Sequence, residues 1–286
     1  MTYTASPVAD RADLLRTLGV FCERPSPHIA ALAETLGLNA PQAAEHTEVF
    51  LQQLPPYASI YLDPEGKIGG EARDRVAGFW RALRMTPPSE PDHLAALLGL
   101  WASILEAAGE EPKPERRRLL EHAARTLVWE HLASWLVPYL TRLGELSTGA
   151  YGDWAALVAS VIEEALHGHA RPEMPVHLML PQEEPTGIDD LVAFLLAPVR
   201  SGIIITRADL SHAATTLGLG MRLGERAFSL SSLLAQARRP VLTWLAEEAE
   251  RQRQLYAAGL PAAIAQAWSS RVGNTLEALR RITPQG

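Results

Sequence analysis

An Asp-His pair lies at the start of a strongly apolar helical pattern. Glu90, Pro91, Asp92 and His93 directly precede a run of apolar residues at helical spacing, namely Leu94, Leu97, Leu98 and Trp101. Proline suits the first turn of a helix because its φ is fixed and it needs no amide partner. A carboxylate in that turn is favoured by the helix dipole. We therefore expect a helix that begins at about Glu90 and presents polar groups at the rim of a core, as a recognition site would.

The chemistry open to Asp92 and His93 is an acid/base couple, part of a metal site or an anchor for a peptide. Neighbouring residues on a helix point about 100° apart, so the two do not form a hydrogen-bonded dyad by default. Catalysis would therefore need a third group from elsewhere in the chain. The structural alternative is a helix-start carboxylate followed by a half-buried imidazole.

A second cluster of aromatic and titratable residues lies in the segment from Trp129 to Leu140. His131 and Trp135 are four residues apart and share one face of the predicted helix, with Glu130 beside them. An indole next to an imidazole suits a groove that accepts an apolar helix and hydrogen-bonds its polar groups. The alternative is a core tryptophan with a histidine at its edge.

Aromatic residues near these two segments allow similar alternatives. Phe79 and Trp80, about ten residues before Glu90, would form either the floor of an apolar pocket or part of the core. Tyr57 and Tyr61 follow the double proline Pro55-Pro56.

The chain offers little for a metal site. His167, His169 and His177 have neither cysteine nor carboxylate partners at ligand spacing. Cys22 is the only cysteine, which excludes an intramolecular disulfide and a cysteine-based zinc site. We expect no metal and no cofactor.

Enzyme motifs are also missing. Gly218-Leu219-Gly220 lacks the third glycine and the preceding strand of a dinucleotide-binding loop, and the sequence contains no Gly-x-Ser-x-Gly elbow. We expect no catalytic residues.

Composition and charge indicate a helical globular protein. Apolar residues make up 47% of the 286 residues, and alanine and leucine dominate over β-branched residues. Acidic residues outnumber basic ones by 33 to 26, so a nucleic-acid partner is not expected. Residues 1–10 lack the pattern of a signal peptide, and no apolar run reaches about 18 residues. We expect a cytoplasmic protein that does not insert into the membrane.

Helical patterns follow one another along the whole chain and predict an all-α fold. Residues 169–187 contain four prolines and little periodicity, which is typical of a linker. We expect a helical domain over residues 1–168 and a further helical region over residues 188–286. Two domains and one elongated unit both remain open.

The segment Glu90-Pro91-Asp92-His93 resembles a signature of the TorD/DmsD family, cytoplasmic chaperones that mature molybdenum-containing redox enzymes. The family's second mark, a His-Leu pair followed by a tryptophan, resembles His131-Leu132 and Trp135. The resemblance covers roughly residues 57–143 and implies a multi-helix TorD-like bundle, with the C-terminal region as an addition. Typical members end soon after the second motif, so the role of that region stays open.

The resemblance implies that the chain binds the twin-arginine signal peptide of a molybdopterin oxidoreductase subunit. Binding would hold the subunit back from export while its cofactor is inserted. Apolar side chains would form a groove, and carboxylates would pair with the arginines. The implied peptide-binding residues are Glu90, Pro91, Asp92, His93, Leu97, Trp101, Glu130, His131 and Trp135. Monomer and homodimer both remain open.

Two other classes of protein are compatible with the sequence. One is a helical scaffold or regulatory protein with a different partner, which would show no preference for twin-arginine peptides. The other is a helical enzyme that uses His93 and His131 as acid and base. The enzyme would need a closed polar pocket that holds both imidazoles.

Overall fold

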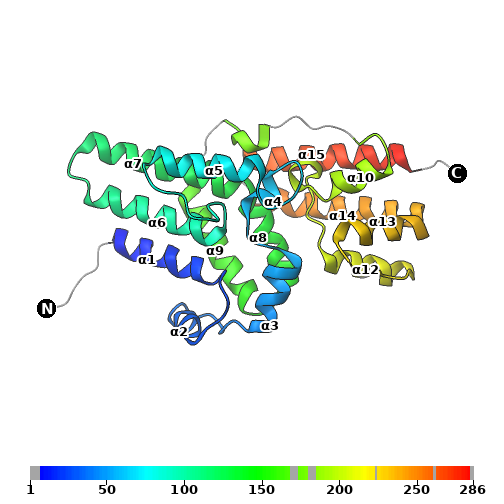
Figure 1. Cartoon of the computed structure of the whole chain (residues 1–286), viewed down its shortest axis with the longest axis horizontal. Coiled ribbons are helices and arrows are strands. Elements are labelled where there is room, and N and C mark those ends of the chain that lie inside the picture. Colours follow the sequence, from blue (N-terminus) through cyan, green and yellow to red (C-terminus); the bar gives the residue numbers. More distant parts are fainter. Residues whose placement is uncertain (1–6, 168–172, 180–184, 223, 260–261, 284–286) are drawn as a thin grey trace. The chain divides into compact units, whose positions relative to one another are not determined.

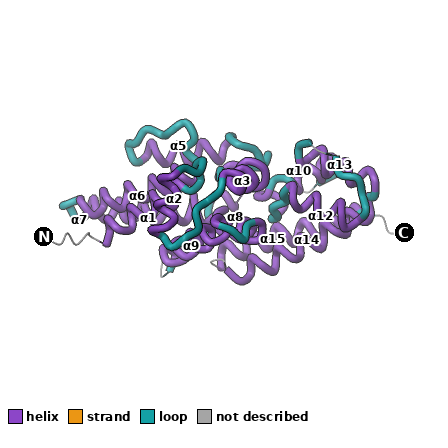
Figure 2. Tube along the Cα trace, turned by 90° about the horizontal axis from the view of Figure 1, so that it is seen from below, coloured by secondary structure: helices purple, strands orange, loops and turns teal. Residues whose placement is uncertain are grey.

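The structure, a computed structural model, describes residues 7–167, 173–179, 185–222, 224–259 and 262–283. Helices and their connecting loops make up all of this part of the chain (Figure 2). Within it the extended pairing is limited to one isolated antiparallel bridge, between Tyr57 and His93. The predicted all-α fold is confirmed.

The contacts divide the chain into two compact units. The first comprises the described residues of Met1–Ala58 and Glu71–Ala170, and the second those of Ser59–Gly70 and Arg171–Gly286. The chain therefore leaves the first unit at residue 59 and returns to it at residue 71. The predicted boundaries, 1–168 and 188–286, do not anticipate this excursion.

The first unit is a bundle of helices in which distant segments lie side by side (Figure 1). α1 packs along α6, α6 also packs on α7, and α8 packs on α9. Its helical elements are α1 (Pro7–Val20), α2 (Pro27–Thr35), α3 (Ala43–His46), η1 (Thr47–Gln53), α5 (Gly70–Ala82), α6 (Leu94–Glu110), α7 (Pro114–Thr126), η2 (Leu127–Ala133), α8 (Ser134–Leu146) and α9 (Ala150–Leu166).

Tryptophans and satisfied polar groups hold the core of the first unit together. Trp129, Trp135 and Trp154 are all buried. The indole nitrogen of Trp154 donates to the carbonyl of Leu18 at 3.0 Å, which ties α9 to α1. A buried N–H without a partner would lower stability by about 1–3 kcal/mol. This hydrogen bond therefore allows the indole of Trp154 to lie in the core without that cost.

α7, η2 and α8 follow one another without a break. Pro138 lies inside α8. The sequence did not indicate that the middle segment, η2, is a π-helix. π-turns widen a helix by one residue per turn and are frequent at functional sites. The second motif is located in this widened turn.

The second unit is also helical. Its elements are α4 (Ala58–Leu62, whose first residue belongs to the first unit), η3 (Val176–Met179), α10 (Ile188–Leu195), α11 (Pro198–Ser201), α12 (Arg207–Leu217), α13 (Arg226–Gln236), α14 (Arg238–Gly259) and α15 (Ala262–Ile282). α14 and α15 pack along each other, and the rings of Tyr256 and Trp268 meet at 6.0 Å between them.

Ala237 separates α13 from α14. Its backbone is not helical, with φ −152° and ψ 75°. Pro240 is the third residue of α14. Proline is tolerated in the first turn because the amides there have no partner within the helix.

Residues 59–70 form a compact excursion that packs on the second unit. The chain forms the short helix α4 here, followed by turns. Gly66 has φ +64°, and a β-carbon there would lie 2.6 Å from the carbonyl oxygen of Leu196. Only glycine permits both this backbone conformation and this close approach.

Candidate functional site

His93 begins α6 and caps it. Its backbone is extended (φ −66°, ψ 139°), and its Nδ1 accepts a hydrogen bond from the amide of Ala95 at 3.2 Å. The prediction that Glu90 and Asp92 lie in the first turn of the helix is wrong, since the helix begins at Leu94. Residues 90–92 form a turn before it.

The double-proline segment holds this turn in place. The amide of Ala58 donates to the carbonyl of Asp92 at 3.0 Å, and the amide of Leu94 donates to the carbonyl of Pro56 at 2.9 Å. These bonds form the antiparallel bridge between Tyr57 and His93. Pairing of the backbone with residues 56–58 explains why residues 92 and 93 are extended rather than helical.

The side chains of the two bridged residues, Tyr57 and His93, also contact each other. The rings of Tyr57 and His93 meet edge to face with centroids 4.8 Å apart. The Tyr57 hydroxyl donates a hydrogen bond to the carboxylate of Glu90. Burial, followed by this bond and the nearby carboxylates, raises the pKa of Tyr57 to about 12. Glu90 is exposed but held in place by the tyrosine.

Three carboxylates surround the imidazole of His93. Burial lowers its pKa, and the negative charges of Glu90, Asp92 and Glu23 partly offset that effect. The imidazole is therefore neutral at neutral pH, which is the form that can accept a hydrogen bond at Nδ1. Asp92 is only 1% exposed, while Glu23 and Glu90 face solvent. The result is a corner of the first unit with an acidic rim and an aromatic interior.

The second motif lies in the π-helical turn η2. His131 is 7% exposed, and its ring lies 5.0 Å from the ring of Phe79 on α5. The indole of Trp135 donates to the backbone carbonyl of His131 at 2.8 Å. Glu130 is half-buried, and its backbone carbonyl accepts from the Ser134 hydroxyl at 2.7 Å.

Helix α5 borders both motifs. Near its start, the guanidinium of Arg73 donates to the carbonyl of Ser89, next to Glu90, at 3.0 Å. Six residues later, Phe79 contacts His131. Six residues correspond to a rise of about 9 Å along a helix, so the two motifs border α5 about 9 Å apart along its axis.

Several predicted groove residues are part of the core. Leu97, Trp101 and Trp135 are 0%, 3% and 0% exposed, and Pro91 is buried as well. The guanidinium of Arg11 on α1 lies 5.6 Å from the ring centroid of Trp101 and helps to cover it. These side chains do not form an open groove in this structure.

The accessible part of the predicted site is smaller. It comprises exposed Glu90 and half-buried His93 and Glu130. Half-buried Phe79 and Trp80 on α5 add aromatic surface. No local pattern in the sequence pointed to Glu23, which lies 70 positions from His93 along the chain.

The described residues contain no group of three histidine, cysteine or acidic side chains that could hold a metal ion. Of the histidines considered above, His177 is buried and His169 lies outside the described residues. Burial raises the pKa of the Cys22 thiol, which disfavours the thiolate needed of a nucleophile.

Among the described residues, no helix is both long enough and apolar enough to span a membrane.

Comparison with known proteins supports the resemblance noted from the motifs. Residues 23–140 match the model of the nitrate reductase delta subunit family, and this segment contains both motifs. The chain is also 30% identical to the chaperone protein TorD of Shewanella amazonensis, over 44% of this chain. The match spans 63% of the length of that relative. These two matches support the predicted resemblance to the TorD family.

Proposed function

We propose that the chain is a cytoplasmic chaperone for a molybdopterin-dependent oxidoreductase. It binds the N-terminal signal segment of the catalytic subunit and keeps that subunit available for folding and cofactor insertion before export. The family match and the TorD relative support a chaperone over an enzyme. His93 also acts as a helix cap, and His131 packs on Phe79, so neither imidazole has the arrangement expected of an acid/base pair.

The observation that carries the proposal is the acidic corner at the start of α6. Glu90 presents an exposed carboxylate that accepts a hydrogen bond from the Tyr57 hydroxyl, and the negative charge of exposed Glu23 acts on the imidazole of His93. Guanidinium groups bind carboxylates through charge-assisted, often bidentate hydrogen bonds. An arginine pair in the signal segment can therefore engage this rim without displacing buried groups.

The apolar part of the signal segment would pack farther along α5. Half-buried Phe79 and Trp80 supply aromatic surface there, with buried His131 against Phe79 and half-buried Glu130 beside it in the chain. An extended peptide advances about 3.3–3.6 Å per residue, so about three residues cover the 9 Å between the two motifs. Buried Leu97, Trp101 and Trp135 support this surface from within the core.

A labelled twin-arginine peptide, titrated into the protein and followed by fluorescence anisotropy, tests the proposal. Glu90→Gln should weaken binding about tenfold, since it removes one charge-assisted contact worth about 1.4 kcal/mol. Glu115→Gln on α7 is the matched control, because Glu115 is also an exposed glutamate in the first unit. A peptide with glutamines in place of both arginines should bind equally weakly to the protein and to the Glu90 variant.

The rival reading, a scaffold with a different partner, makes the opposite prediction. It requires that the twin-arginine peptide and its glutamine version bind alike. Equal affinity of the two peptides would reject the proposed function, but it would not affect the resemblance to the TorD family.

A further inference from the structure

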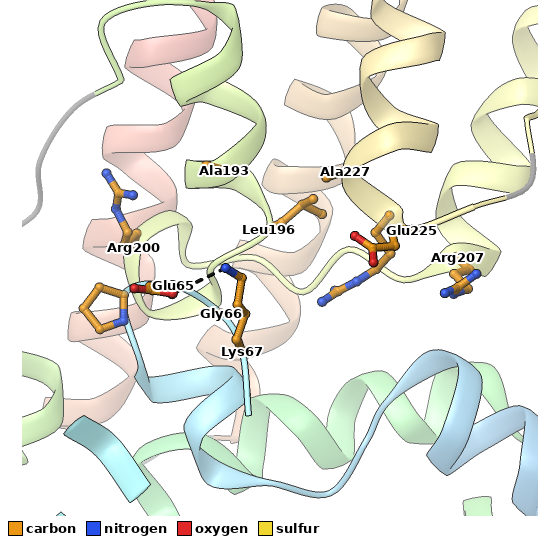
Figure 3. Close-up of a pocket in the computed structure, with 11 residues that line it drawn as sticks. Glu65, Gly66, Lys67, Ala193, Leu196, Arg200, Arg207, Glu225 and Ala227 are labelled. Carbon is orange, nitrogen blue, oxygen red and sulfur yellow. Dashed lines mark hydrogen bonds and ion pairs between the residues drawn. The ribbon is translucent and has the colours of Figure 1, made fainter. Parts of the chain in front are cut away.

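A cavity of about 650 Å³ lies within the second unit, and none of the residues that line it is among those proposed to bind the signal segment. The excursion 64–67, the end of α10 and the starts of α12 and α13 line it (Figure 3). Its charged lining residues are Glu65, Lys67, Arg200, Arg207, Glu225 and Arg226. Four cationic and two anionic side chains give the cavity a net charge of +2.

The three arginines of the cavity have no carboxylate partner among the described residues. Arg207 donates to the carbonyl of Gly224 at 2.7 Å, and Arg226 donates to that of Ile205 at 2.8 Å. The Arg200 guanidinium lies 5.5 Å from the ring centroid of Phe194. Each guanidinium has five N–H donors, so these contacts leave most of their hydrogen-bonding capacity unused.

Arg207 and Arg226 also repel each other. Burial lowers the pKa of Arg226, and the charge of Arg207 lowers it further, while Tyr61 opposes the shift. A chain that needed these side chains only for packing would gain from a neutral residue or a paired carboxylate. Like charges gathered around a cavity are instead typical of a site for an anion.

The carboxylates of the cavity do not neutralise this cluster. Glu65 pairs with Lys67 at 3.4 Å, and both side chains are largely exposed, so their contact contributes little (Figure 3). Glu225 occupies the N-cap position of α13, but its side chain makes no capping hydrogen bond. Its carboxylate forms no ion pair with a described residue, although three arginines line the same cavity.

From this arrangement we infer that the cavity is a binding site for a phosphate monoester, held chiefly by Arg207 and Arg226. The charge of a phosphate monoester, about −1.5 to −2 at neutral pH, matches the net charge of the cavity. Its three terminal oxygens accept hydrogen bonds on several sides, which suits guanidinium groups that reach the cavity from different elements. The cavity volume leaves room for the organic part of the ester beyond the phosphate.

Binding of phenyl phosphate to the full chain, measured by isothermal titration calorimetry at constant ionic strength, tests the inference. We expect saturable binding that falls at least tenfold in Arg207→Gln. Arg207 is exposed, so this variant should fold. Arg239→Gln, which removes an exposed arginine of the same unit outside the cavity, should bind within twofold of the parent. Glu225→Gln should bind more tightly, because it removes a repelling carboxylate at the rim.

Other ligands decide the chemical class. Phenol should not bind, and succinate should bind at least tenfold more weakly than phenyl phosphate. Equal binding of succinate would overturn the assignment to a phosphate ester, and the absence of saturable binding would overturn the site altogether. Binding of phenyl phosphate that is unchanged in Arg207→Gln would also overturn the site. None of these results bears on the twin-arginine peptide, which is proposed to bind the first unit.

Discussion

The ring of Tyr57 lies edge to face against the ring of His93, with centroids 4.8 Å apart, and the backbones of the two residues pair as an antiparallel bridge. This relationship joins the double-proline segment to the start of α6. It also places the tyrosine hydroxyl on the carboxylate of Glu90. The two conspicuous sequence features, Pro55-Pro56 and Glu90-Pro91-Asp92-His93, therefore form one structural element.

Tyr57→Phe removes the hydroxyl while keeping the ring contact with His93. The Glu90 carboxylate then loses the group that orients it, and we expect affinity for the twin-arginine peptide to fall three- to tenfold. Stability should fall by only about 1 kcal/mol, the net contribution of one hydrogen bond. Anisotropy titration and thermal melts measure the two effects. Unchanged affinity would mean that the tyrosine does not orient the binding carboxylate.

The stability of the first unit should depend on the protonation of His93. Its folded pKa lies below that of the unfolded chain, because burial disfavours the charged form. The stabilisation is thus fully present above the unfolded value of about 6.5, and it is lost as pH falls through the folded pKa. Protonation also removes the acceptor that caps α6 at Ala95. Glu23, Glu90 and Asp92 oppose the effect, since they favour the imidazolium.

His93→Asn tests this dependence, since asparagine is a good N-cap that does not titrate. Between pH 7.5 and pH 5, urea unfolding should show a smaller loss of stability in the variant than in the parent. His122→Asn, at an exposed position on α7, is the control and should behave as the parent does. If the stability of the parent and that of His93→Asn fell equally with pH, the pH dependence would not be due to His93.

His131→Ala should weaken peptide binding about fivefold, or about 1 kcal/mol, and leave the helical content nearly unchanged. The variant removes the imidazole that contacts Phe79 but keeps the backbone carbonyl that accepts from Trp135. Circular dichroism and the anisotropy titration separate the two outcomes. If the variant unfolds, His131 is a structural residue and its place in the peptide site is wrong.

Gly66→Ala should destabilise the second unit more than an ordinary glycine substitution. A left-handed backbone costs alanine about 1–2 kcal/mol, and the clash with Leu196 adds about 1–3 kcal/mol. Gly218→Ala is the matched control, because Gly218 also lies in the second unit and has φ +65° but no atom within 4 Å of its β-carbon position. A larger loss in melting temperature for Gly66→Ala is expected, and equal losses would mean that the excursion moves aside without cost.

The helices followed from the sequence because their signals are local. Alanine- and leucine-rich periodic segments predicted the helices of α6, α7 and α8, and prolines stand near the starts of α6 and α7. The site followed less well because its geometry depends on contacts between distant segments. Pairing of residues 56–58 with 92–94 moved the helix start from Glu90 to Leu94, and no local pattern reports such a bridge.

Burial was the other property that periodicity could not resolve. Trp101 and Trp135 lie at helical spacing, which fits a groove and a core equally well. Trp101 lies in the core because α1 packs on α6. The π-turn at η2 and the excursion 59–70 likewise have no signature in a single sequence.

Capture of the client from the native host tests the central claim most directly. The tagged chain, with Glu90→Gln and Glu115→Gln as paired variants, is used as bait, and mass spectrometry identifies what each retains. We predict that the chain and the Glu115 variant retain a molybdopterin oxidoreductase subunit with its N-terminal signal attached, and that the Glu90 variant retains much less. Retention of an unrelated partner, or of the subunit equally by all three baits, would contradict a signal-binding site at the start of α6.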